Sequence, residues 1–503
     1  MSEQVQLITF GKRDPMSSLD RSGDGNKVFA DPWQQSPLYK NGSVESSASE
    51  RERFLPPVKL DPGWDSMPNS TVGIKKSSTV QQIEELEKDP PKDRLNIVYI
   101  VMIIHGIAIL IPWNMFINAK AYFENYKLQS NQSSPALIDY RTNFMSYIGM
   151  ASQFPNFLMN IINIFVQCGG NTLGLRVLSG IIITVIMFVL TTVLAMIDSS
   201  EWPEMFFWIT MGTAIVINAA VGIYQNSMYG LAASLPMKYT NAIIFGNNIS
   251  GTLVALTNII VLALSPGKKT SAIYYFVVAI IILMLAFDAY FITGHTKFYR
   301  HYCKLTELKK QEYHEKNANS RDPFYKLLFR SFGRVFTKIY HLMFGVWFTF
   351  FITLLLFPTV MSDIKPLEID MDGEYWTAIF CFLFFNLFAT FGNLTTEFIR
   401  WPSHRWIIVL VLLRVFFIPL MVLGNFRPET RSWAVLIPYD GVFIATAVLF
   451  SFSSGYCSSL TMMYAPKCVE HNDAPIAGMI MALSLVFGIL CGINCSRIWG
   501  FVI

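Results

Sequence analysis

Long apolar segments, separated by short polar breaks, occupy most of the chain after residue 93. A segment of bilayer length can cross a hydrocarbon core of about 30 Å as an α-helix, because a helix satisfies its own backbone polar groups. The pattern predicts eleven such helices, at 95–117, 143–166, 173–196, 205–235, 242–264, 272–293, 341–361, 375–398, 404–424, 438–464 and 476–501. The predicted fold class is an all-α polytopic membrane protein.

Two polar segments divide the chain into regions. Residues 1–93 are rich in serine, proline and charge, and they cannot bury enough apolar surface to offset the entropy of ordering. We expect them to form a disordered cytosolic tail, in which only 80–87 has a helical pattern. The second polar segment, 295–340, separates a six-helix half at 94–294 from a five-helix half at 341–503.

The distribution of basic residues predicts the orientation in the membrane. The segment 295–340 contains eleven lysine and arginine residues, and such a density next to membrane helices is typical of a cytosolic loop. The amino terminus is then cytosolic and, with an odd number of spans, the carboxyl terminus is extracellular. The sequon Asn131-Gln132-Ser133 falls in the first outer loop, so Asn131 is the predicted glycosylation site. We expect the plasma membrane as the location, with an endosomal or lysosomal membrane as the alternative.

The composition agrees with a membrane protein and excludes several other classes. Hydrophobic residues make up 52% of the chain and charged residues only 15%, unlike a typical soluble domain. The net charge of +4 is dispersed, which argues against binding to nucleic acid. The seven cysteines form no CxxC pair, and the chain has no Walker A, HExxH or GxSxG motif. We therefore predict no enzymatic activity, no metal site and no cofactor.

Uncharged amide side chains recur inside the predicted spans. Asparagine and glutamine within a membrane tend to face the bundle interior or a wet cavity, and an amide can both donate and accept hydrogen bonds. Such side chains suit a neutral, polar, heteroaromatic solute. One face of the first span combines them with apolar and aromatic residues: Leu110, Trp113, Asn114 and Ile117. From its position alone, Trp113 fits a membrane-interface anchor equally well.

An ordered set of motifs resembles the equilibrative nucleoside transporter family. The motifs include Pro112-Trp113-Asn114, Tyr224-Gln225-Asn226-Ser227, Leu235-Pro236, Arg414-Val415-Phe416-Phe417-Ile418-Pro419-Leu420 and Ser454-Gly455-Tyr456. The resemblance implies a six-plus-five arrangement similar to the major facilitator fold, with a central cavity and alternating access by rocking of one half against the other. It also implies facilitative transport of nucleosides such as adenosine and uridine, and of nucleobases as a further substrate class.

The resemblance assigns roles to several side chains. It implies that Leu110, Trp113 and Ile117 line the cavity from the first span, and that Gln225 in the fourth span binds the nucleobase. A hydrogen bond to a neighbouring helix is the alternative role for Gln225. Beside Pro155, where the family places apolar cavity residues, this chain has the polar pair Gln153 and Asn156.

The eighth span departs from the family pattern Phe-Asn-x-x-Asp-x-x-Gly-Arg. This chain has Ala389 and Asn393 at the positions of the acid and the base, which in the family touch the sugar hydroxyls. Asn386 and Asn393 become the candidate polar contacts in this span. Arg414 in the ninth span loses its obvious acidic partner, and we predict that it faces the cavity and touches the solute.

Three functions are compatible with these observations. The first is passive transport of nucleosides by a monomer in the lipid bilayer. The second is proton-coupled transport of nucleosides or nucleobases in an acidic organelle, with His105 as the titrating group. His105 lies on the opposite side of its helix from Asn114, however, which favours a packing role. The third, suggested by the missing charge pair, is a non-transporting membrane receptor or scaffold.

Overall fold

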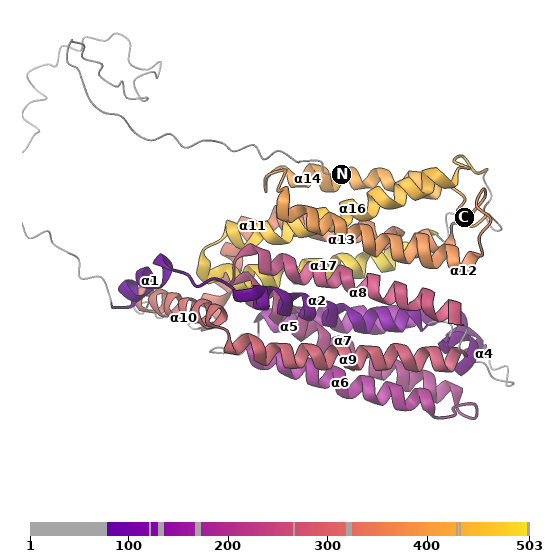
Figure 1. The fold of residues 1–503 in the computed structure, drawn as a ribbon, viewed down its shortest axis with the longest axis horizontal. Helices are drawn as coiled ribbons and strands as arrows, with labels where there is room; N and C mark the ends of the chain where they lie inside the picture. Colours follow the sequence, from indigo (N-terminus) through magenta and orange to yellow (C-terminus); the bar gives the residue numbers. More distant parts are fainter. Residues whose placement is uncertain are drawn as a thin grey trace, which may run out of the picture. The chain divides into compact units, whose positions relative to one another are not determined.

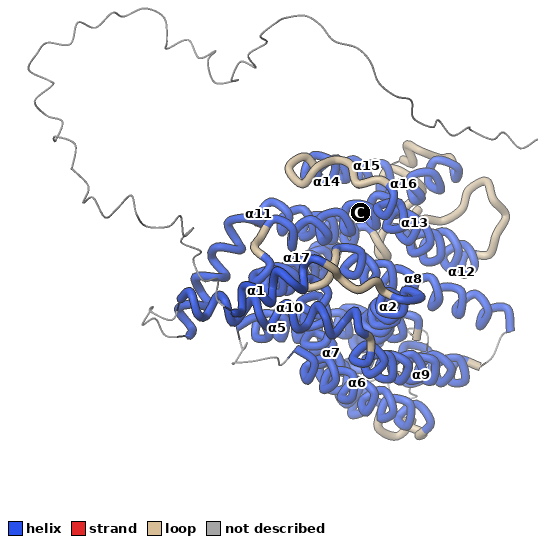
Figure 2. Tube along the Cα trace, turned by 60° about the vertical axis from the view of Figure 1, so that its left-hand side comes forward, coloured by secondary structure: helices blue, strands red, loops and turns tan. Residues whose placement is uncertain are grey.

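The computed structural model describes residues 78–119, 122–128, 135–165, 173–264, 267–317, 324–428, 431 and 434–499. Long helices of the predicted spans run side by side (Figure 1). Figure 2 shows that the described chain consists of helices and connecting loops. The one β-type contact in this part of the chain is an isolated antiparallel bridge between Ile364 and Phe426. The predicted all-α class is confirmed.

Six long helices make up the N-terminal half. They are α2 (Ile97–Asn118), α5 (Phe144–Phe165), α6 (Leu173–Met196), α7 (Pro203–Ala233), α8 (Met237–Leu264) and α9 (Lys268–His295). A π-helical turn, η4 (Phe123–Lys127), and the short helix α4 (Pro135–Thr142) lie between α2 and α5. Each of the first six predicted spans therefore corresponds to one helix.

The C-terminal half contains the remaining five spans. They are α11 (Phe324–Leu356); the continuous rod of α12 (Gly373–Trp376), η6 (Thr377–Leu383) and α13 (Phe384–Phe398); the broken rod of α14 (Ile407–Leu413), η7 (Arg414–Phe416) and α15 (Phe417–Val422); α16 (Asp440–Tyr464); and α17 (Ala474–Cys495). Pro419 explains the break, because its ring disfavours an α-helical carbonyl four residues earlier, at Val415. The chain tightens there into a 3₁₀ turn.

Helix length and composition support a membrane location. Among the described residues, nine helices are long and apolar enough to cross a membrane, and Ile407–Val422 is a shorter apolar helix. The remaining predicted span is α5, which contains several polar residues and is not one of the nine. Large apolar side chains on the bundle surface are exposed, for example Ile186 on α6 and Leu285 on α9, each 55% accessible. Such an apolar surface is suited to lipid.

The two halves pair their helices in the same way. In each half the first span packs along the fifth, as α2 on α8 and α11 on α17, and the second packs along the fourth, as α5 on α7 and α13 on α16. Glycines permit these close approaches. A Cβ atom on Gly106 of α2 would overlap the backbone of Ile243 in α8, and one on Gly455 of α16 would overlap the backbone of Ala389 in α13.

The basic segment between the halves forms helix α10 (Lys297–Asn317), which contacts the tail helix α1 (Ser78–Lys88). Ile83 packs against Leu305 and Leu308 of α10, and the Lys309 ammonium group pairs with Glu87 at 2.5 Å. The helix predicted at 80–87 is therefore present and docked. We call this end of the helix bundle, at the left in Figure 1, the α10 end, and the opposite end the α12 end.

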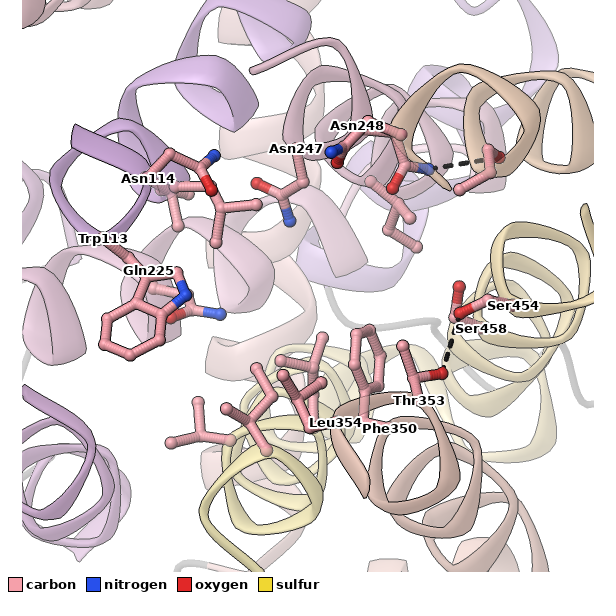
Figure 3. Close-up of a pocket in the computed structure, with 18 of the residues that line it drawn as sticks. Trp113, Asn114, Gln225, Asn247, Asn248, Phe350, Thr353, Leu354, Ser454 and Ser458 are labelled. Carbon is pink, nitrogen blue, oxygen red and sulfur yellow. Dashed lines mark hydrogen bonds between the residues drawn. The ribbon is translucent and has the colours of Figure 1, made fainter. Parts of the chain in front are cut away.

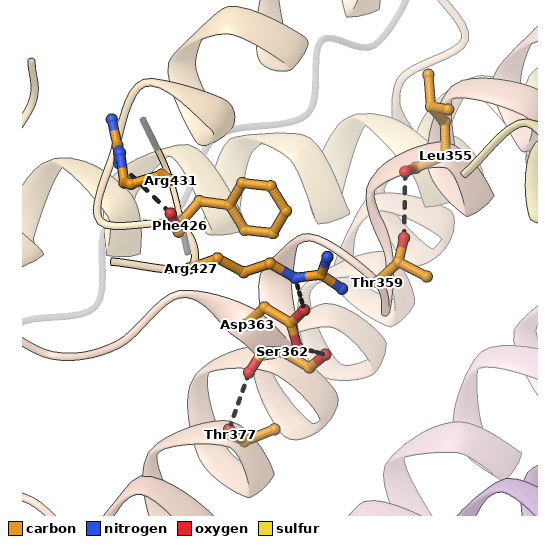
Figure 4. Close-up of polar contacts among 8 residues, drawn as sticks. All are labelled: Leu355, Thr359, Ser362, Asp363, Thr377, Phe426, Arg427 and Arg431. Carbon is orange, nitrogen blue, oxygen red and sulfur yellow. Dashed lines mark hydrogen bonds and ion pairs between the residues drawn. The ribbon is translucent and has the colours of Figure 1, made fainter. Parts of the chain in front are cut away.

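Polar contacts tie the C-terminal half together at the α12 end (Figure 4). The guanidinium group of Arg427 donates to the Asp363 carboxylate at 2.5 Å, next to the bridge between Ile364 and Phe426. The buried carboxylate of Asp440 accepts hydrogen bonds of 2.8–3.0 Å from the backbone N–H groups of Leu367, Glu368 and Ile369. These contacts connect the loop after α11 to the loop before α16 and to the first residue of α16.

At the α12 end of the N-terminal half, the side chain of Lys127 binds backbone carbonyl groups near the end of α6. Lys127 is a buried residue, 4% accessible, and its ammonium group donates to the carbonyl oxygens of Leu194 and Ile197, in the last turn of α6 and just after it. A cation at this end of a helix interacts favourably with the helix dipole. Burial, and secondly the charge of Lys269, lower the pKa of Lys127 to about 8.

Candidate solute-binding cavity

A cavity lies between the two halves and receives side chains from both (Figure 3). The N-terminal half contributes residues of α2, α5, α7 and α8, and the C-terminal half contributes residues of α11, α13, α16 and α17. Its volume, counted as the space open to the centres of water molecules, is about 130 Å³. At about 30 Å³ per molecule, as in liquid water, that space holds about four water molecules. Each of the described lining residues has an uncharged side chain.

The structure brings most of the predicted contact residues together at this cavity. Seven of the ten line it: Leu110, Trp113, Asn114, Gln153, Asn156, Gln225 and Asn386. The other three, Ile117, Asn393 and Arg414, are not among its lining residues. The predicted glycosylation site, Asn131, lies outside the described residues.

Side-chain amides dominate the wall from the N-terminal half. Trp113 and Gln225 face the cavity in Figure 3, from α2 and α7. Asn218 lies two helical turns before Gln225, and its amide nitrogen donates to the Ala214 carbonyl oxygen at 2.9 Å. Leu110 and Val221 supply apolar surface between the polar groups. This wall can therefore offer hydrogen bonds beside aromatic and aliphatic surface.

Two further asparagines, Asn247 and Asn248 of α8, line the cavity and were not predicted. The Asn247 amide nitrogen donates to the Tyr229 hydroxyl at 3.1 Å, and that of Asn248 donates to the Ala389 carbonyl oxygen at 3.4 Å. The Asn247 Oδ1 atom is buried and has no hydrogen-bond partner among the described residues. The sequence pattern that could have indicated a polar face of α8 is the recurrence of asparagine at Asn241 and Asn248, seven residues apart on one helix face.

The wall from the C-terminal half is mainly apolar, and its polar side chains are mostly hydroxyl-bearing. Phe350 and Thr353 of α11 line it, with Phe357 just beyond the helix. The Phe357 ring stacks on Phe385 of α13 with a centroid separation of 3.9 Å. The Thr353 hydroxyl lies 3.0 Å from the hydroxyl of Ser454 on α16. One half therefore presents mostly amides, and the other mostly apolar side chains with a few hydroxyl groups.

Arg414 lies behind the C-terminal wall rather than on it. Its side chain is 1% accessible, and its guanidinium group donates to the Thr353 hydroxyl at 2.8 Å, the Ser453 hydroxyl at 2.5 Å and the Phe450 carbonyl oxygen at 3.0 Å. The guanidinium carbon also lies 4.8 Å from the centre of the Phe450 ring. All of these partners are neutral. Thr353 connects Arg414 to the cavity, because Thr353 is a lining residue and Arg414 is not.

Asn393 belongs to a polar contact between the halves on the α10 side of the cavity. Its amide nitrogen donates to the Asn241 side-chain oxygen at 2.9 Å and to the Ser459 hydroxyl at 2.5 Å. The Asn241 amide nitrogen donates to the Glu397 carboxylate at 2.6 Å. These bonds join α8 to α13. They place Asn393 in a helix contact and not on the cavity wall.

A second contact between the halves joins α7 to α17. The Asn226 amide nitrogen donates to the Met479 carbonyl oxygen at 3.0 Å and to the Asn160 side-chain oxygen at 3.0 Å. Asn163 in turn donates to the Asn226 side-chain oxygen at 2.8 Å. Met479 lies near the start of α17, before the cavity residues of that helix, so this contact also lies towards the α10 end. We call the two contacts, at Asn241 and at Asn226, the amide seams.

His105 is a packed residue of the N-terminal half. Its side chain is buried, its Nδ1 atom lies 2.7 Å from the Tyr224 hydroxyl, and its ring meets Tyr290 edge to face. It is not among the residues that line the cavity. These contacts join α2 to α7 and α9, in agreement with the packing role that the helix geometry favoured.

Comparison with known proteins identifies the family. The family model described as "Nucleoside transporter" matches residues 211–502. Equilibrative nucleoside transporter 3 of Rattus norvegicus is 30% identical over 429 residues, which cover 81% of this chain and 90% of that protein. The chain belongs to the equilibrative nucleoside transporter family. Another member, equilibrative nucleoside transporter 1 of Homo sapiens, is 29% identical over 446 residues, covering 80% of this chain and 96% of that protein.

Membership in the equilibrative nucleoside transporter family makes the chain a membrane transporter and not an enzyme. The fold agrees with a solved transporter, the E. coli fucose:proton symporter, at a TM-score of 0.51 and 11% identity. That match covers 80% of this chain and 91% of the symporter. The symporter is itself a major facilitator superfamily transporter. The predicted similarity to the major facilitator fold is confirmed.

Proposed function

We propose that this protein carries nucleosides across a membrane down their concentration gradient. In this mechanism the cavity opens alternately to one side of the membrane and then to the other. The observation that carries the proposal is an uncharged, amide-lined cavity between two similarly packed halves in a member of the nucleoside transporter family. Rocking of one half against the other opens one end as it closes the other. Adenosine and uridine are the substrates that we expect, with nucleobases as a further class.

The proposed contacts follow the chemistry of the two walls. Gln225 hydrogen-bonds the nucleobase, while Trp113 and Leu110 pack against it; Gln153, Asn156 and Asn114 supply further polar contacts from the N-terminal half, and Asn386 supplies one from the other half. Ile117 lies one helical turn beyond Trp113 towards the α12 end, where it meets the solute as it enters. Arg414 acts through Thr353, whose hydroxyl it holds in place.

Passive transport is favoured over proton coupling by the side chains around the cavity. Proton-coupled carriers place titratable groups on the path of the solute, whereas the described lining residues here are uncharged and His105 packs against Tyr224. Proteoliposomes with and without an imposed pH gradient test the mechanism. We expect labelled adenosine and uridine to reach equilibrium and no more, at the same rate in both cases. Accumulation above equilibrium when the pH gradient is present would show that the passive mechanism is wrong.

The transport activity itself is tested in expressing oocytes with labelled adenosine, uridine and adenine. Uptake of at least one nucleoside above water-injected controls is the expected result. If all three compounds fail to enter although the protein reaches the surface, the chain acts as a receptor or scaffold instead.

Location, orientation and oligomeric state complete the proposal. The basic α10 end is proposed to face the cytosol, which leaves the amino terminus inside and the carboxyl terminus outside, in a plasma-membrane monomer. Asn131 then carries the glycan, and Asn131→Gln should remove the mobility shift that glycosidase produces in the wild type. Surface biotinylation and light scattering in detergent test the location and the monomer. Retention in endosomes or lysosomes would assign the alternative membrane.

A further inference from the structure

We propose that Asn247 determines which solutes the cavity accepts, by receiving a hydrogen bond from a ribose hydroxyl group of the nucleoside. The inference rests on the proposed function, because it assigns a contact of the proposed substrate. No role was predicted for Asn247, and the case rests on its buried, unpartnered side-chain oxygen, its hydrogen bond to Tyr229 and its place on the cavity wall.

The unusual feature of Asn247 is an acceptor without a partner. Buried polar atoms are nearly always hydrogen-bonded, and an exception on a cavity wall calls for a partner such as a water molecule or a solute. Among the described residues that line the cavity, Asn247 is the one with a buried side-chain oxygen that lacks a partner. A solute with a hydroxyl or amino donor supplies that partner on binding.

Tyr229 holds the amide of Asn247 in its orientation. The tyrosine side chain is fully buried, and its hydroxyl accepts the amide N–H of Asn247 at 3.1 Å. The backbone of Tyr229 is itself fixed, because Gly478 of α17 packs against it so closely that a Cβ atom there would lie 2.5 Å from the Tyr229 carbonyl oxygen. With the N–H bound to Tyr229, the side-chain oxygen remains as the acceptor for solute.

The hydrogen bonds of the asparagines on α8 and α13 show which polar atoms near Asn247 are already paired. Ala389 of α13 contributes only a methyl group to the wall, and the Asn248 side chain crosses from α8 to bind its carbonyl oxygen at 3.4 Å. The Asn386 amide donates to Phe382 within its own helix at 2.9 Å. The amide N–H groups of Asn248 and Asn386 are thus already bound to backbone carbonyl oxygens, whereas the side-chain oxygen of Asn247 has no partner among the described residues.

The ribose is the donor that fits this acceptor best. Nucleosides differ in the donors on their bases, and uridine has no exocyclic amino group, whereas every ribonucleoside carries ribose hydroxyl groups. A site built to bind a hydroxyl rejects the analogue that lacks it, because its own buried polar atom is then left unpaired. Asn247 therefore allows the cavity to separate ribonucleosides from deoxynucleosides.

The test compares initial uptake of adenosine, its 2′-, 3′- and 5′-deoxy analogues, and inosine at low concentration in proteoliposomes containing the full chain. In the wild type, loss of the contacting hydroxyl should lower Vmax/KM about tenfold. In Asn247→Leu, adenosine uptake should fall about tenfold, and that deoxy analogue should then be carried as well as adenosine. The control Asn494→Leu removes an exposed amide outside the cavity and should keep the wild-type ratios.

Several outcomes would overturn the inference. One is a wild-type protein that carries all deoxy analogues as well as adenosine. Another is Asn247→Leu, present at wild-type levels, that keeps the wild-type discrimination. Loss of discrimination between adenosine and inosine alone would assign Asn247 to the base and contradict the ribose contact.

A second variant covers the case in which Asn247→Leu does not fold. Tyr229→Phe leaves the Asn247 amide in place but frees it to rotate, so discrimination against the same deoxy analogue should fall about threefold. Unchanged discrimination in this variant would contradict the inference. Failure of the proposed function looks different, because the wild type would then carry neither adenosine nor uridine.

Discussion

The two halves of this transporter are alike in how their helices pack and unlike in what they present to the cavity. Both halves pair the first span with the fifth and the second with the fourth, and both use glycine at the closest crossings. Yet the N-terminal half lines the cavity mainly with amides, and the C-terminal half mainly with apolar side chains, aromatic and aliphatic, beside a few hydroxyl groups. In the proposed mechanism, the repeated packing allows the two halves to rock, and the unequal walls determine which solute binds.

The two walls also differ in whether their polar groups reach the cavity surface or lie behind it. In the N-terminal half the amides reach the cavity themselves, as Gln225 and Asn247 do. In the C-terminal half the guanidinium group of Arg414 stays behind the wall and acts on Thr353. This difference predicts that substitutions in the two halves change transport in different ways.

The largest effect is expected where the packing is equivalent. Gly106→Ala and Gly488→Ala, at the crossings of the first and fifth spans, should each destabilise the protein by about 3 kcal/mol or more, because the added Cβ atom overlaps a backbone carbonyl oxygen of the partner helix, Ile243 or Trp347. Gly212→Ala is the matched control, since its Cβ atom meets nothing within 4 Å. That control should be neutral or gain up to about 1 kcal/mol of helix propensity. Melting in detergent measures all three, and a stable Gly106→Ala beside an unstable Gly488→Ala would disprove the equivalence of the halves.

The second-largest effect is expected to differ between substitutions in the two cavity walls. Gln225→Leu should lower nucleoside Vmax/KM ten- to thirtyfold, since a polar group of the solute then faces an apolar side chain, at a cost of about 1–2 kcal/mol. Phe350→Leu on the opposite wall should lower it only about threefold, because apolar contact area is reduced and no polar group is left unpaired. Uptake per molecule of surface protein gives both values. Equal losses would contradict a division of labour between the walls.

Arg414→Met should lower uptake about fivefold while leaving melting within about 1 kcal/mol of the wild type. The substitution removes the support of Thr353 but strands no opposite charge, because the partners of Arg414 are neutral. Arg427→Met, which breaks the partly exposed pair with Asp363, is the control and should transport normally. If Arg414→Met leaves both uptake and surface expression unchanged, Arg414 has no part in transport.

The smallest effect concerns the α12 end of the N-terminal half. The pKa of Lys127 is lowered to about 8 in the folded protein, mainly by burial, from 10.5 for an ordinary lysine. Between these values the unfolded chain binds more protons than the folded one, so this group makes stability rise as the pH rises from 8 to 10.5. Melting of the wild type and Lys127→Met across this range should show a rising difference in favour of the wild type. A flat difference would mean that Lys127 titrates normally.

The spans could be predicted from sequence because they depend on local pattern. Apolar blocks of bilayer length and one basic loop were enough to predict eleven spans in two groups. The helical face of Leu110, Trp113 and Asn114 was also readable, because residues three and four apart share a side of a helix. The structure places all three of these residues on the cavity wall.

The position of a residue along the helix axis, relative to the cavity, was much harder to predict than the helix face on which it lies. Ile117 shares a face with Leu110, and Asn393 shares one with Asn386, but seven residues correspond to about 10 Å along a helix. That distance carries Asn393 out of the cavity and into the amide seam with Asn241. Asn247 was missed for the related reason that the register of α8 against α2 and α13 depends on contacts between distant segments.

The uncharged lining of the cavity has an electrical consequence. A voltage of 100 mV changes the free energy of moving one elementary charge across a membrane by about 2.3 kcal/mol, but it does no net work on a neutral solute. Since the described wall adds no charge of its own to the path, each nucleoside would cross without a current. Depolarisation of a cell would then leave the direction of flow to the two concentrations alone, and the same molecule could load a cell at one moment and empty it at the next.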